Sequence, residues 1–159
     1  MAQHMDRRYR KRMAAYWVRA EARACRRIDA LDISSWFDCW HTHVDWYGRG
    51  NSREESREDV AASTVRVLTH LAERAETRHE PLQIWATLCN DTMDNAVYAH
   101  SPNPNGTAYP NEHHGVLWGK PVPEWVSAAV NATHEVGVAG HGDGVVYVIR
   151  PRLMSASSQ

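Results

Sequence analysis

The sequence predicts an α+β fold, in which helices pack on one face of a mainly antiparallel sheet and the first helix is long. Two stretches, 1–31 and 52–78, carry apolar residues every three to four positions, as amphipathic helices do. Two others, 82–100 and 133–150, alternate in the manner of strands and turns. Because no strand–helix–strand repeat is visible, we expect an antiparallel sheet and not a parallel one.

The length of 159 residues predicts one domain, which we place at 1–152, followed by a flexible polar tail at 153–159. The longest apolar run has six residues, far fewer than the roughly 20 that a membrane-spanning helix needs. The arginine-rich start also lacks the apolar core of a signal peptide. We therefore expect a cytoplasmic protein that makes no contact with a membrane.

The first 30 residues predict a basic amphipathic helix. They hold nine Lys/Arg and three acids, a net charge of +6, so that the rest of the chain carries −7. Met13, Trp17 and Ile28 belong to its apolar stripe, and arginine fills much of the opposite face. Two interpretations remain open, a helix docked on the domain with solvated arginines or a nucleic-acid-binding helix. The first needs no ligand and is the simpler one, so we do not expect nucleic acid as the main partner.

The second helix is predicted from about Ser52, where Ser52 and Glu55 have the spacing of a capping box, to near Arg78, ahead of Pro81. Its apolar stripe starts at Val60. Residues 31–51 lie between the two helices and are the part of the chain most crowded with aromatic, His and Asp side chains.

The second half of the chain predicts two antiparallel pairs of strands. Residues 82–89 and 96–100 form the first pair, and residues 133–138 and 145–150 form a closing hairpin. Residues 101–111 hold three prolines and a glycine, which predicts a surface loop. A short helix is expected within 123–130. The predicted order is therefore two helices, two strands, a helix and two strands.

Three cysteines, Cys25, Cys39 and Cys89, lack the spacing of a zinc site or a disulfide framework. In a cytoplasmic protein such an odd set is typical of reduced, buried thiols. The sequence also offers no glycine-rich nucleotide loop and no nucleophilic serine motif. We therefore expect no cofactor.

His41-x-His43-x-Asp45 is the most closely spaced group of candidate catalytic or metal-binding residues in the chain. On an extended segment these three side chains project from one face, where they could bind a divalent metal ion. The pattern resembles part of the HxHxDH signature of metallo-β-lactamase-like hydrolases, but Trp46 stands where the last His would be. A small metal-dependent hydrolase or nuclease therefore stays an alternative. The other interpretation is a polar cluster on a binding face, with Trp40 and Trp46 packed on the opposite side.

Trp46 and Tyr47, beside Asp45, are typical of the aromatic residues that dominate protein–protein interfaces. We therefore predict that these two side chains belong to a partner-binding surface.

Two stretches carry a family resemblance: WFDCWHTHVDWYGRGN at 36–51 and DNAVYAHSPNPN at 94–105. They look like the paired WHxHxDW…G and DAVYxHxPNPN signatures of small bacterial proteins. That group resembles the immunity proteins of polymorphic toxins in contact-dependent and type VI secretion systems. The resemblance implies that the chain inhibits a cognate toxin by stoichiometric binding, with no catalytic residue and no metal.

If these two stretches meet in space, their polar side chains make one surface that could plug the active site of a toxin. The acidic remainder of the chain would complement the basic cleft of a toxin that acts on nucleic acid or nucleotides. The residues that we expect on the partner-binding surface are His41, His43, Asp45, Trp46, Tyr47, His100, Asn103 and Asn105.

Overall fold

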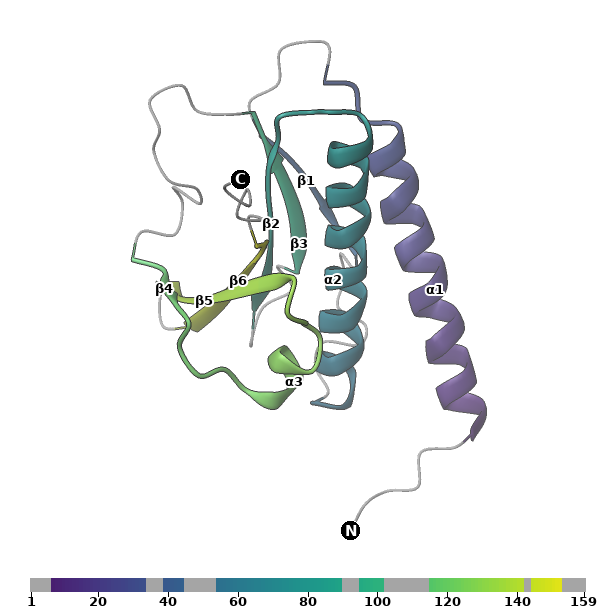
Figure 1. Cartoon of the computed structure of the whole chain (residues 1–159). Helices are drawn as coiled ribbons and strands as arrows, with labels where there is room; N and C mark the ends of the chain where they lie inside the picture. The colour runs from purple at the N-terminus through teal and green to yellow at the C-terminus, as the bar shows by residue number, and fades with distance from the viewer. Residues whose placement is uncertain are drawn as a thin grey trace.

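A computed structural model describes residues 7–33, 39–44, 54–89, 95–101, 115–141 and 144–152. Within these residues the chain alternates between helices and strands, and all of the strands join one sheet (Figure 1). The elements are α1 (Arg7–Asp29), β1 (Cys39–His43), α2 (Glu54–Thr77), β2 (Gln83–Cys89), β3 (Ala96–His100), β4 (Leu117–Trp118), α3 (Glu124–Ser127), β5 (His134–His141) and β6 (Gly144–Pro151).

The described strands form a six-stranded sheet in the order β1-β3-β2-β6-β5-β4, and every neighbouring pair is antiparallel. β1 and β4 are the edge strands. β1 precedes α2 in the chain but pairs with β3, which follows β2. The first part of the candidate motif therefore sits at one edge of the sheet, against the strand that carries the second part.

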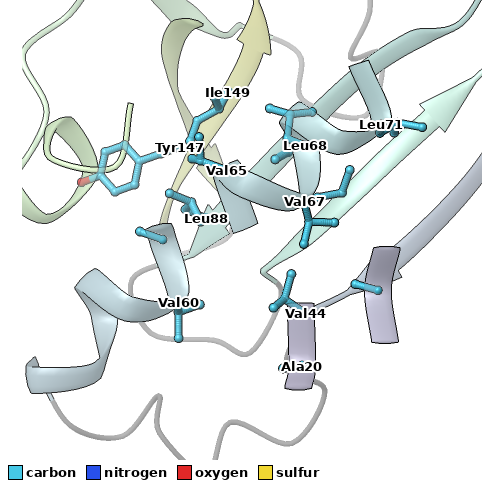
Figure 2. Packing of buried hydrophobic residues seen from close by; sticks show 14 of the residues in the cluster. Ala20, Val44, Val60, Val65, Val67, Leu68, Leu71, Leu88, Tyr147 and Ile149 are labelled. Atoms are coloured by element: carbon cyan, nitrogen blue, oxygen red, sulfur yellow. The ribbon is translucent and has the colours of Figure 1, made fainter. Parts of the chain in front are cut away.

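α2 lies directly on one face of the sheet and forms the centre of the main core (Figure 1). Leu68 and Leu71 of α2 are fully buried, as are Leu88 of β2 and Ile149 of β6 on the helix-facing side of the sheet (Figure 2). Both sides of α2 are covered, because the sheet lies on one side and α1 on the other. This explains why small and polar residues such as Ser63 are fully buried in this helix.

α1 packs along α2 through a narrow stripe of buried residues, Trp17, Ala20, Ala24 and Ile28, with spacings of three and four (Figure 1). Its alanines let the two helix backbones approach closely. Arginine and alanine, which dominate its sequence, have high helix propensity and support the rest of its length.

The polar contacts between the two helices use acids of α1 and cations or hydroxyls of α2. Ser63 Oγ and Arg66 Nε donate to Glu21 Oε1 at 2.7 and 2.8 Å. Nearer the end of α1, His70 Nε2 lies 2.8 Å from Asp29 Oδ1. Both acids of α1 are therefore turned toward α2.

Arg74 of α2 holds the C-terminus of α1. Its guanidinium donates to the backbone oxygens of Ile28 and Leu31, the second at 2.6 Å, and forms a salt bridge with Glu80 at 2.8 Å. The Arg74 side chain is 4% exposed. The last carbonyls of a helix lack partners within the helix. Arg74 supplies a donor to the Leu31 oxygen and a second donor to the Ile28 oxygen, which also accepts from the Leu31 N–H at 3.1 Å.

The predicted α+β class and antiparallel sheet are confirmed, and α1, α2, β2 and β3 match their predicted segments to within a few residues. The predicted order was wrong in two places, because β1 lies between the two long helices and the two-residue β4 precedes α3. The tail at 153–159 lies outside the described residues. Within the described residues, no helix is both long and apolar enough to cross a membrane.

Candidate functional site

The pairing of β1 with β3 brings together three of the predicted site residues. His41 is opposite Tyr98 and Cys39 is opposite His100 in the register. Side chains of directly opposed residues in an antiparallel pair point to the same face, and so do alternate residues along one strand. His41, His43 and His100 therefore share the face of the sheet that α1 and α2 do not cover.

An aromatic row runs across this face over three strands, and we define it as His43, His41, Tyr98 and Trp85. The rings of His43 and His41 meet edge to face with centroids 5.3 Å apart. His41 lies 5.6 Å from Tyr98, and Tyr98 stacks on Trp85 at 4.9 Å with the ring planes only 5° apart. The offset and edge-to-face geometries are those that aromatic rings favour.

Exposure rises from Trp85 to His41 along the aromatic row and falls again at His43, which is half-buried. Trp85, on the central strand β2, is 2% exposed, Tyr98 on β3 is half-buried, and His41 on the edge strand β1 is exposed. The inner end of the row is therefore anchored in the protein, while the outer end presents an imidazole to the surroundings. Such an arrangement fixes the orientation of an exposed ring before any ligand arrives.

An open pocket of about 280 Å³ lies beside the outer end of the row. It is lined by Arg27, His41, Thr42 and His43. Arg27 comes from the last turn of α1, where its Nε donates to Thr42 Oγ1 at 2.9 Å and its Nη2 to the His43 backbone oxygen at 3.3 Å. Arg27, His41 and His43 therefore line one pocket at the β1 edge, and side chains of these types can donate hydrogen bonds to a carboxylate or a backbone carbonyl.

The other half of the same face is closed by a second, smaller core. Trp85, Val146 and Val148 are buried there, and Trp118 of β4 packs against them. The guanidinium of Arg150 lies 3.7 Å above the ring of Trp118 and also pairs with Glu135 at 2.7 Å. Among the described residues, this half of the face is therefore occupied by the protein's own side chains, and the accessible part is the β1–β3 edge.

The predicted partner-binding residues divide into two sets. His41, His43 and His100 are brought together as described, whereas Asp45, Trp46, Tyr47, Asn103 and Asn105 lie outside the described residues. Within the described ranges, no group of three or more His, Cys, Asp or Glu side chains is arranged to hold a metal ion. Trp40, which was expected on the side opposite the histidines, does pack against the main core.

The expectation that all three thiols are buried was wrong. Cys39 is exposed on β1, and Cys25 and Cys89 are half-buried; none of the three is in a disulfide. Cys39 alternates with the two histidines along the strand, which places it on the accessible face. Desolvation, followed by the charges of Asp29 and Glu21, raises the pKa of Cys25, so that thiol stays protonated.

Sequence reasoning missed Arg27 and Tyr98 as members of the site. Tyr98 could have been found, because the predicted strand at 96–100 places it on the same face as His100. Arg27 is one of nine Lys/Arg in the first 30 residues, and its sequence context does not distinguish it from the other eight. No protein-family model, no curated protein sequence and no solved structure matches this chain.

Proposed function

We propose that this chain is an immunity protein, which binds a cognate bacterial toxin stoichiometrically and neutralises it without catalysing a reaction. The proposal draws on the resemblance of residues 36–51 and 94–105 to immunity proteins. The observation that carries it further is the aromatic row, which includes an exposed His41 held between Tyr98 and His43, beside the pocket that Arg27 lines.

The chemistry of this edge suits a protein partner. Tyrosine, tryptophan and arginine are the residue types most enriched where interfaces concentrate their binding energy. Here a half-buried Tyr98 rests on a buried Trp85, so docking against it would order few additional rotamers. Low ordering cost leaves more of the contact energy available for affinity.

The pocket supplies the polar part of the same surface. The Arg27 guanidinium donates to β1 through two of its nitrogens and retains further N–H donors for an incoming acceptor. A carboxylate or main-chain carbonyl of the toxin would occupy the pocket, while the apolar side of the partner packs on the aromatic row.

The test is co-expression with the toxin domain encoded beside this gene, with growth and co-purification as readouts. The unaltered chain should restore growth and form a one-to-one complex. His41→Asn should weaken the complex about tenfold or more, the loss typical of an interface residue worth at least 1.4 kcal/mol. Its thermal midpoint should stay unchanged, because His41 is exposed.

The matched control is His79→Asn. His79 is another exposed histidine, located just after α2, and its φ of 53° is one that asparagine tolerates. The proposal predicts that this variant protects cells as well as the unaltered chain does. Equal protection by His41→Asn and Arg27→Gln would remove the β1 edge from the interface, and failure of the unaltered chain to protect would remove the immunity function.

The metal-dependent hydrolase alternative has its own readout. Purified protein should contain no stoichiometric zinc or manganese and should turn over no nucleic acid or small ester. A tightly bound metal ion together with a turnover that His41→Asn abolishes would replace the binding proposal by an enzymatic one.

A further inference from the structure

A second surface lies on α1 and takes no part in the candidate site. α1 contains eight arginines, one lysine and two acids, and all nine cationic residues are exposed. Its two acids, Glu21 and Asp29, are both engaged with side chains of α2. The inner side of the helix therefore holds the negative charge, and the outer side holds only positive charge.

Four of the arginines make a continuous line, which we call the arginine stripe. At 100° per residue, their positions fall within about 60° of one another around the helix and extend over roughly 21 Å. The members of the arginine stripe are Arg12, Arg19, Arg23 and Arg26.

Among the described residues, the arginine stripe takes no part in the contacts that hold α1 on the domain. α1 is held by its buried residues, by Glu21 and Asp29, and by Arg74 at its end. The cations that contact α1 across the helix pair, Arg66 and Arg74, come from α2, so the stripe is not neutralised from that side. Four parallel guanidinium groups repel one another, and a bound polyanion would relieve that repulsion.

We propose that the arginine stripe binds the phosphate backbone of a nucleic-acid duplex without reading its sequence. A duplex carries one negative charge about every 1.7 Å of its axis, so it offers phosphates along the whole length of the stripe. Guanidinium matches phosphate oxygens in a bidentate geometry, which fits the eight-to-one excess of arginine over lysine in α1. The small, exposed Ala15 and Ala22 beside the stripe allow a backbone to approach closely.

Two other occupants fit less well. A membrane surface would be bound through inserted apolar side chains, but the apolar stripe of α1 is buried against α2. Among the described side chains of α1, only Val18 is a large apolar residue that is exposed. An acidic protein would rarely present charges at a regular spacing over this length. The charge of −7 on the rest of the chain favours an orientation in which α1 alone faces the duplex.

The experiment measures the fluorescence anisotropy of a labelled 20-base-pair RNA duplex and of the DNA duplex of the same sequence, between 50 and 300 mM KCl. Four phosphate contacts predict a slope of log K against log salt of roughly −3.5. Arg19→Gln/Arg23→Gln should reduce that slope by about two units and weaken binding at 100 mM KCl about tenfold or more.

The matched control is Arg78→Gln/Lys120→Gln, which removes the same charge from exposed positions outside α1. It should keep the affinity within about twofold. Equal losses in the two double variants would overturn the proposal, because the effect would then come from net charge. So would absence of duplex binding at 50 mM KCl, or equal binding of polyglutamate or phosphatidylserine vesicles at the same sites.

These outcomes are separate from those of the toxin experiment. The Arg19→Gln/Arg23→Gln variant and its control leave Arg27 and His41 unchanged, and both should protect cells as the unaltered chain does. Stronger binding of RNA than of DNA would identify the A-form duplex as the preferred source of phosphate, and equal binding would show that only the phosphate chemistry is recognised.

Discussion

The two faces of the sheet use the same strands and differ in what covers them. On the face toward α1 and α2, the strands present Leu88, Ile149 and other aliphatic side chains to a continuous helix layer (Figure 2). On the other face they present the aromatic row and a small core, and burial falls from Trp85 to the exposed His41. Adjacent residues of a strand point to opposite faces of the sheet. One strand can therefore pack against the helices on one face and contribute to the aromatic row on the other.

The comparison of the two faces shows which residues stabilise the fold and which residues are available to contact a partner. Substitutions toward the helices create cavities in the main core, whereas substitutions at the β1 end of the other face alter an accessible surface. The central part of that second face is an intermediate case, since its residues are buried without being covered by a helix. The predictions below test that boundary.

Trp85→Ala has the largest expected effect, a loss of about 3–5 kcal/mol in the free energy of unfolding. Trp85 is the base of the second core and the stacking partner of Tyr98, so its removal leaves a cavity and frees the aromatic row. Urea unfolding followed by circular dichroism measures the loss. A loss below about 1 kcal/mol would mean that the second core is not a stabilising unit.

Gly137→Ala should cost about 1–3 kcal/mol through overpacking. A Cβ at Gly137 would overlap a methyl group of Val116 and meet the Trp118 ring at 3.0 Å. The double variant Gly137→Ala/Val116→Ala removes that methyl group and should recover part of the loss. If the single variant unfolds at the same urea concentration as the unaltered chain, the β4 end of the helix-free face is looser than its packing indicates.

A smaller effect concerns pH. Burial lowers the pKa of His134, at the start of β5, below its ordinary value of about 6.5. The unfolded chain therefore binds this proton more readily than the folded chain, and stability should fall as the pH drops through about 6.5 toward the lowered pKa. His134→Gln should flatten the decline between pH 7 and 5 in thermal unfolding, and an unchanged slope would assign the decline to other groups.

Much of the fold could be predicted because local patterns agree with it. β2, β3 and the β5–β6 hairpin were recognisable from alternation and turn residues, and the two long helices from their apolar spacing. β1 was missed as an element because its pattern is ambiguous: Trp40 and Thr42 face inward, but Thr42 is polar. Its partner β3 lies more than 50 residues later in the chain, and no local signal encodes that pairing.

The candidate site could be predicted only in part for the same reason. Placing His41 near His100 depended on two stretches meeting, which the β1–β3 register brings about. The contribution of Arg27 depends on α1 ending beside β1, which is a property of helix packing and not of the sequence around Arg27. Long-range packing, unlike periodicity, cannot be read from neighbouring residues.

The guanidinium of Arg74 has a consequence for anyone who shortens this chain. Without α1, Arg74 would lose the Ile28 carbonyl, and the side of α2 that includes Ser63 would meet water. We therefore expect deletion of the first helix to destabilise the remaining domain, because it exposes a buried side of α2.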